Sequence, residues 1–167
     1  MGLYPLIRKI ERHVVLVAPE IHWNTGNIGR TCLAAGSSLH LIKPLGFSLD
    51  ERQVKRAGLD YWRHVDLTIW DNFDALRQSL QVQPAEVALF AKLGPRSFRD
   101  LPDPRRLFLV FGAETRGLPR SILDAYPGAA FHIPIRRATR SLNLSTAVGI
   151  ALYESLRHQD GFHGWVS

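Results

Sequence analysis

Cysteine is nearly missing from this sequence, and so is any spacing typical of a metal site. Cys32 is the only cysteine among 167 residues, which excludes an internal disulfide framework and every cysteine-cluster metal site. The seven histidines show no zinc-ligand spacing such as His-Glu-x-x-His, so we expect no metal. A single thiol suits a reducing compartment, and we therefore expect a cytoplasmic protein.

Long apolar runs are missing as well. No segment approaches the roughly 20 apolar residues that a membrane span requires, and the first residues lack the apolar stretch of a signal peptide. The N-myristoylation pattern fails, because position 6 is neither Ser nor Thr. We therefore expect no membrane contact. With 46% hydrophobic residues, the sequence fits one compact domain over residues 1–167, without room for a second.

Acidic residues are fewer than basic ones. The formal net charge is +6 and the sequence pI is about 10.0, which favours a polyanionic partner over an ordinary basic surface. Guanidinium groups suit phosphate recognition in particular. The arginines that cluster within or beside two loops are Arg105, Arg106, Arg116, Arg120, Arg136, Arg137 and Arg140.

These two loops, residues 111–119 and 133–145, each follow a short apolar run. In open α/β sheets, ligands bind at the carboxyl ends of strands, where such loops lie. Neither loop matches the glycine patterns of Rossmann or P-loop proteins. We expect a nucleotide-like ligand between the loops, on a different scaffold.

Strand-like and helix-like segments alternate along the chain, which predicts an α/β fold with a mainly parallel sheet. The first helix is expected to begin with Asn24 or Thr25 as its cap and to end near Gly36. The predicted strands are residues 13–17, 39–42, 67–70, 87–91, 107–111 and 130–133. The predicted helices are residues 25–37, 50–57 and 72–80, a short one from Pro119, and residues 143–158.

The last predicted helix carries two apolar stripes. The stripe expected to face the core consists of Leu144, Ala147, Val148, Ala151, Leu152 and Ser155. The opposite stripe consists of Thr146, Ile150, Tyr153 and Arg157, and it is more apolar than a solvated face usually is. We expect it to mediate self-association, so that the protein forms a homodimer.

Five motifs occur in an order that resembles the SPOUT-class RNA 2'-O-methyltransferases of the SpoU (TrmH) type. They are residues 19–30, 43–47, 56–62, 111–119 and 141–147. The resemblance covers residues 13–158, and the Arg-Ala-Gly-Leu-Asp-Tyr segment from Arg56 favours the branch that modifies the tRNA wobble nucleotide. It implies a SPOUT fold with helices on both faces of the sheet. It also implies a deep C-terminal trefoil knot within residues 85–158, an exception to the usual absence of knots.

The resemblance implies S-adenosylmethionine as the cofactor. Glu114 either balances the sulfonium charge of the cofactor or holds its own loop, and Gly117 allows close backbone approach. By position, the resemblance implies that Leu89 at the end of its strand, Gly112 in the first loop, and Ile133, Ser141 and Leu142 in the second loop also surround the cofactor.

The implied reaction is methyl transfer to a ribose 2'-hydroxyl, which depends largely on positioning. Arg30 and Asn27 are expected to orient the RNA phosphate and to stabilise the developing alkoxide, and Asn143 and Ser145 to fix the ribose or the loop. A guanidinium stays protonated, so a role for Arg30 as a literal base is the less favoured alternative. The residues expected to contact RNA are Asn24, Arg116, Arg136, Arg137 and Arg140.

The expected substrate is wobble nucleotide 34, a cytidine or modified uridine, of tRNA-Leu. The alternatives are another tRNA or rRNA position, or a noncatalytic RNA-binding module on the same scaffold. No separate RNA-binding domain is expected, so a second subunit would supply RNA contacts. The chain carries His22-Trp23 where relatives often have Pro-Pro, and Trp23 either stacks on a base or is buried by packing.

Overall fold

The computed structural model describes residues 10–49 and 61–158. The helix predicted at residues 50–57 lies outside the described residues. The strands are β1 (Glu11–Val17), β2 (Ser38–Ile42), β3 (Leu67–Trp70), β4 (Val87–Phe90), β5 (Arg96–Ser97), β6 (Arg106–Phe111) and β7 (Ala130–His132). The α-helices are α1 (His22–Ala35), α3 (Phe73–Ser79), α4 (Arg120–Ala125) and α5 (Leu144–Glu154). Short 3-10 helices are η1 (Trp62–His64), η2 (Pro84–Glu86) and η3 (Phe98–Asp100).

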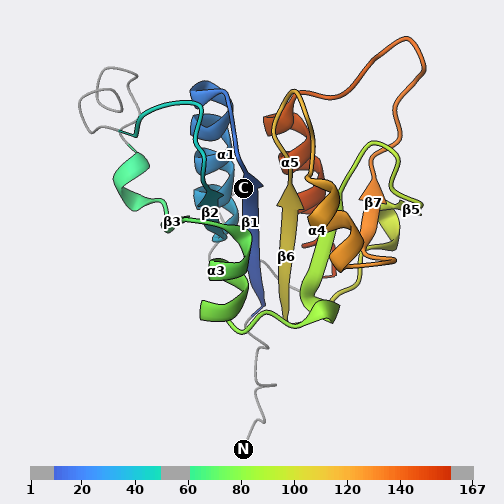
Figure 1. Cartoon of the computed structure of the whole chain (residues 1–167), viewed down its shortest axis with the longest axis horizontal. Coiled ribbons are helices and arrows are strands. Elements are labelled where there is room, and N and C mark those ends of the chain that lie inside the picture. Colours follow the sequence, from blue (N-terminus) through green and yellow to red (C-terminus); the bar gives the residue numbers. More distant parts are fainter. Residues whose placement is uncertain (1–9, 50–60, 159–167) are drawn as a thin grey trace, which may run out of the picture.

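The strands form one seven-stranded sheet in the order β3-β2-β1-β6-β4-β7-β5, and every strand pair is parallel. The predicted α/β fold with a mainly parallel sheet is therefore confirmed. The two-residue strand β5 was not predicted, because it lies in a stretch with turn residues. Since all strands run the same way, the loops after β1, β6 and β7 leave the sheet at one edge, at the top of Figure 1.

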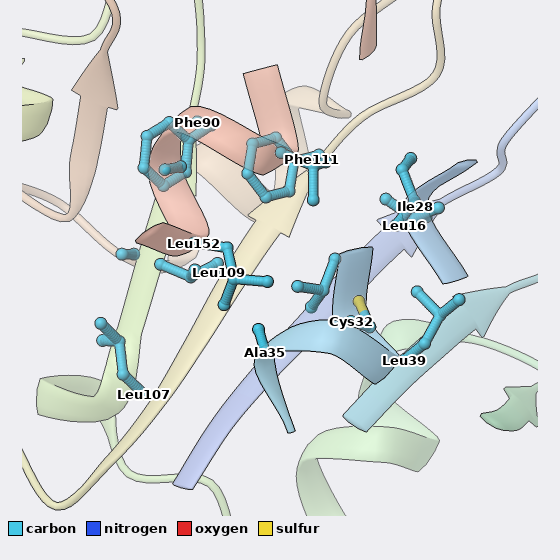
Figure 2. Close-up of a cluster of buried hydrophobic side chains, with 14 of the residues drawn as sticks. Leu16, Ile28, Cys32, Ala35, Leu39, Phe90, Leu107, Leu109, Phe111 and Leu152 are labelled. Carbon is cyan, nitrogen blue, oxygen red and sulfur yellow. The ribbon is translucent and has the colours of Figure 1, made fainter. Parts of the chain in front are cut away.

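Helices cover both faces of the sheet, as predicted. On one face, α1 and α5 pack over alternate strand residues such as Leu16 and Leu109. Figure 2 shows this cluster, in which the rings of Phe90 and Phe111 stack with centroids 4.7 Å apart. On the other face, α3 and α4 cover residues of β1, β4 and β6, including Val110. The strands β1, β2, β4 and β6 are thus buried on both sides, which is the usual condition of a parallel sheet.

The face of α5 predicted to pack against the core does so. Val148, Ala151 and Leu152 are fully buried, and the partly buried Leu144 and Ala147 pack against the same cluster. Each such apolar side chain contributes roughly 1.5–3 kcal/mol when it is completely removed from water. No helix in the described part of the chain is long and apolar enough to cross a membrane.

The predicted start of α1 at Thr25 is wrong. The helix begins three residues earlier, at His22, and Asn24 and Thr25 are buried within its first turn. The N-cap residue is Ile21, whose side chain cannot accept a hydrogen bond. The sequence therefore shows no capping residue at the true start of the helix. The predicted end is correct, because Gly36 takes the left-handed conformation with φ of 64°.

The predicted end of α5 at His158 is also wrong. The helix stops at Glu154, and the carbonyl of the next residue, Ser155, accepts two hydrogen bonds from the Arg12 guanidinium of β1, at 3.2 and 3.0 Å. Arg12 is 3% exposed and also forms an ion pair of 2.6 Å with Asp103. A buried cation from the first strand therefore binds the free carbonyl at the end of the last helix.

Two histidines lie against each other in the sheet, on the face that carries Phe108. Trp70 Nε1 donates to Nδ1 of His40 at 3.1 Å, so the neutral His40 ring carries its proton on Nε2. That nitrogen lies 3.0 Å from Nδ1 of His13. Nε2 of His13 is buried and has no partner among the described residues. Burial lowers the pKa of both rings, that of His40 to about 4.

We expect acid to destabilise the fold through this pair. The unfolded chain binds a proton at each histidine below about pH 6.5, whereas the folded chain resists protonation, so stability falls as pH drops below 6.5. For His40, whose pKa in the folded state is about 4, the free energy of unfolding should fall by about 2 kcal/mol between pH 7 and pH 5. Urea unfolding at both pH values measures this loss.

The His40→Gln variant should lose less stability than the parent over the same interval, because it lacks the titrating ring. His64→Gln, at an exposed position of η1, is the matched control and should keep the parent's pH dependence. An identical pH dependence in His40→Gln and the parent would show that the buried pair is not responsible.

Candidate active site

The loop after β6 forms a tight turn at the carboxyl edge of the sheet. Ala113 and Gly117 form an antiparallel bridge in which Gly117 N donates to Ala113 O at 2.8 Å. Gly117 has a φ of 67°, and a Cβ atom on Gly112 would lie only 1.9 Å from the Gly117 carbonyl carbon. Both glycines are therefore required by the turn itself. Their contact with a ligand stays a prediction.

Glu114 reaches from this turn to the beginning of α1. Its carboxylate accepts hydrogen bonds from the main-chain N–H groups of Glu20 and Ile21, at 2.8 and 3.2 Å. It accepts a third from Asn24 Nδ2 at 3.1 Å. The first N–H groups of a helix lack partners within the helix and favour a nearby anion. Glu114 thus connects the turn after β6 to the beginning of α1, and its role toward the sulfonium charge stays a prediction.

A second carboxylate binds in the opposite direction. Glu20, in the loop after β1, accepts hydrogen bonds from the main-chain N–H and the hydroxyl of Thr115, at 2.9 and 2.8 Å. These bonds lower the pKa of Glu20, with the hydroxyl contributing most. The two loops are thus joined twice. Glu114 of the loop after β6 binds the loop after β1, and Glu20 of the loop after β1 binds the loop after β6.

Asn24 extends the connection to α5. Its Oδ1 accepts a hydrogen bond of 2.9 Å from Asn143 Nδ2. Asn143 is the N-cap of α5, and its own Oδ1 accepts from the Ser145 N–H and hydroxyl at 2.9 and 2.7 Å. The predicted catalytic residues Asn143 and Ser145 are therefore brought together. Asn24 is only 2% exposed, so the structure places it inside the protein and not on the surface predicted for RNA.

Arg30 and Asn27 lie on the exposed side of α1. The Arg30 guanidinium carbon lies 5.4 Å from the centroid of the Tyr61 ring, within the range of a cation–π contact. The Tyr61 hydroxyl donates to Gly26 O at 2.8 Å, and burial raises its pKa. The sequence analysis missed Tyr61 as a support for Arg30. The glycine spacing in α1 is the only signal that could have found it, because Gly29 leaves room for the adjacent Trp62.

The residues predicted around the cofactor lie in different surroundings. Ile133 and Leu142 are half-buried and Ser141 is exposed, all on the segment between β7 and α5. Within residues 133–142 the described main chain forms one internal hydrogen bond, from Thr139 N to Arg136 O, which leaves most of its donors and acceptors available. Leu89 is fully buried in the core on the α3 and α4 face, and its contact with a cofactor stays a prediction.

The predicted arginine cluster divides into two groups. Arg106 begins β6, at the opposite edge of the sheet, and pairs with Glu86 at 2.7 Å. Arg105 and Arg120 are also paired, with Glu11 and Asp124. Four other arginines are exposed and form no salt bridge within the described residues. They are Arg116, Arg136, Arg137 and Arg140.

Comparison with known proteins assigns this arrangement to a family. The model of the SpoU rRNA Methylase family matches residues 11–153. The chain belongs to the SpoU methylase family. It is 42% identical over 153 residues to the tRNA (cytidine(34)-2'-O)-methyltransferase of Burkholderia ambifaria, covering 91% of this chain and 97% of the relative.

Solved structures agree with the SpoU assignment. A structure solved to study the 2-OH methylation of C/U34 on tRNA superposes with a TM-score of 0.80 at 45% identity, over 90% of this chain and 91% of that one. The AdoMet-bound rRNA methyltransferase of Sinorhizobium meliloti superposes with a TM-score of 0.78 at 27% identity, over 95% and 62% of the two chains. The predicted SPOUT fold is confirmed, whereas the trefoil knot stays a prediction.

The SpoU methylase has no reactive thiol in its described part. Cys32 lies on the core side of α1 (Figure 2), and burial raises its pKa to about 12. A thiol with that pKa is almost entirely protonated at neutral pH.

We expect Glu114→Ala to lower the stability of the protein. Removing the carboxylate leaves the N–H groups of Glu20 and Ile21 and the buried Asn24 amide without this acceptor, which should lower the free energy of unfolding by about 2 kcal/mol. Chemical denaturation measures this loss. Asp124→Ala removes an exposed partner of Arg120 and, as the control, should change stability by less than about 0.5 kcal/mol. Equal effects of the two substitutions would contradict the anchoring role.

Proposed function

We propose that this SpoU methylase transfers a methyl group from S-adenosylmethionine to the ribose 2'-hydroxyl of wobble nucleotide 34 of a tRNA, a cytidine or modified uridine of tRNA-Leu. One observation carries the proposal: the hydrogen-bonded chain Glu114–Asn24–Asn143 joins the loop after β6 to α1 and α5. The exposed Arg30 lies on the same helix, α1. The names of the relatives support the choice of nucleotide.

The residues present suit the proposed cofactor. Residues 133–142 offer unpaired main-chain donors and acceptors for the edge of an adenine, and Ile133 and Leu142 offer half-buried apolar surface for its ring. The turn at Gly112 would form the opposite wall. When bound, S-adenosylmethionine supplies the methyl group as an electrophile.

The protein's own contribution is positioning and electrostatics. Arg30 orients a phosphate of the RNA and stabilises negative charge on the ribose oxygen as its proton passes to solvent water, since the guanidinium itself remains a cation and does not take the proton. Asn27, one helical turn before it, adds an amide on the same side of α1. Asn143 and Ser145 bond to each other and fix the beginning of α5, so they act by holding the loop.

The four unpaired arginines bind the tRNA backbone in this proposal. Arg136, Arg137 and Arg140 lie on the long segment after β7, and Arg116 lies on the turn after β6. All are exposed, so their charges are available to phosphates. Their contribution to affinity weakens as the salt concentration rises.

We also propose that the enzyme works as a homodimer. Ile150 on the outer side of α5 is 36% exposed, and the neighbouring Tyr153 is 44% exposed. An apolar stripe on a helix that lies beside α1 would let a second subunit add RNA-binding surface next to the site.

Incubation of the protein with labelled S-adenosylmethionine and total tRNA, followed by nuclease mapping, tests the function. We expect label on the 2'-oxygen of nucleotide 34. Label at another position would redirect the substrate, and no label on any RNA would favour a noncatalytic binding module.

In the same assay, Arg30→Ala should lower turnover by at least about 100-fold, because the stabilisation of the ribose oxygen is lost. Calorimetry should show an almost unchanged affinity for S-adenosylmethionine. Retained methylation of RNA by this variant would refute the role of Arg30.

The dimer has its own test. Ile150→Glu combined with Tyr153→Asp places two charges on the outer stripe of α5, and sedimentation should then give half the mass of the parent protein. Ile69→Glu, at an exposed position of β3, is the control and should keep the parent mass. An unchanged mass for the double variant would contradict this interface.

A further inference from the structure

Trp23 is exposed in a way that packing does not explain. Its side chain is 64% exposed on the first turn of α1. Of the two readings of Trp23 made from the sequence, burial by packing is therefore wrong for the described chain. A tryptophan carries one of the largest apolar surfaces of any residue, and leaving it in water forgoes that stabilisation. Such a side chain is expected to have a partner when the protein functions.

The residues that share one side of α1 with Trp23 are polar or cationic. Trp23, Asn27 and Arg30 are spaced by four and three residues, so they lie along one side of α1, and all three are exposed. The rise of the helix separates Trp23 from Arg30 by about 10 Å. An aromatic ring, an amide and a guanidinium therefore follow each other along the same surface. The helix contains no acidic residue that would repel an anion.

The indole is also held in place. The ring of His22 lies against it edge-on, with centroids 4.8 Å apart and an interplanar angle of 73°. A contact of this kind restricts the orientation of the indole before any partner binds, which lowers the entropy cost of stacking.

We propose that Trp23 stacks on a nucleobase of the bound RNA, next to the nucleotide whose phosphate contacts Arg30. The inference rests on the proposed function and extends it by naming a residue that positions the substrate. Flat π surfaces flanked by cations are the usual platform for unpaired bases. A second protein subunit is the less suitable partner, because the residues that follow Trp23 along this side of α1 are Asn27 and Arg30, whose amide and guanidinium groups suit a sugar–phosphate backbone.

A thermodynamic cycle tests the contact. The affinity of the protein for the anticodon stem-loop RNA of tRNA-Leu is measured with Trp23 and with Trp23→Ala. It is then measured again with stem-loops that lack the base at one loop position at a time. We expect Trp23→Ala to weaken binding of the intact stem-loop by about tenfold, within the range found for loss of one stacked base. At one position, removal of the base should abolish the difference between the two proteins.

Controls separate stacking from other roles. Trp23→Phe should retain most of the affinity, and Ile69→Ala, at an exposed apolar position on β3, should retain all of it. Affinity for S-adenosylmethionine should be the same in all variants. The stacking proposal is overturned if the difference between the proteins persists with every abasic stem-loop, or if Trp23→Ala sediments at half the parent mass. If the parent protein methylates no tRNA, the proposed function fails, and the cycle still reports on the contact.

Discussion

The site depends on one carboxylate that caps a helix far from it in the sequence. Glu114 accepts hydrogen bonds from two main-chain N–H groups at the beginning of α1 and from the amide of Asn24. The positive end of the helix and its unpaired donors make this position favourable for an anion. Because Glu114 belongs to the turn after β6, the cap also fixes that turn against the first helix. The position of α1 and the shape of the loop are therefore set by the same interaction.

Around Glu114, the side chains that hold the elements together differ from those that are exposed for binding. The polar atoms of Glu114, Asn24 and Asn143 are occupied by one another and by helix ends. Arg30 and the four unpaired arginines are exposed on α1, on the turn after β6 and on the segment after β7. The reaction of a SpoU methylase depends on the accurate placement of a ribose oxygen more than on covalent participation of the protein. A rigid polar network beneath a cationic surface suits that task.

Much of the fold was predictable, because hydrophobic periodicity reports on burial. The sheet, its parallel direction and the core face of α5 follow from the positions of apolar residues. The helix ends were predicted wrongly where a residue far away in the sequence binds the end of the helix. Glu114 caps α1 and Arg12 binds the end of α5, and neither partner is visible in the local sequence. Arg106 was grouped with the arginines of the loops because it is close to them in sequence. It lies at the opposite edge of the sheet from the loop that follows its strand.

For the site, the motifs pointed to the loops after β6 and β7 but did not indicate the contacts of each residue. Asn24 has the same chemistry as Asn27, yet the twist of the helix turns it inward, and only the correct helix boundary reveals this. Leu89 was assigned from the family resemblance, and the structure shows that its side chain is buried in β4. The bond between Asn143 and Asn24 spans 119 residues, so no local pattern could have indicated it.

That span also has a consequence for biosynthesis. Asn24 receives its partner only after the chain has grown past residue 143 and α5 has packed beside α1. Closing so long a loop has an entropic cost that the final contacts must offset. A nascent polypeptide on the ribosome therefore lacks the bond between Asn24 and Asn143 until its last helix emerges.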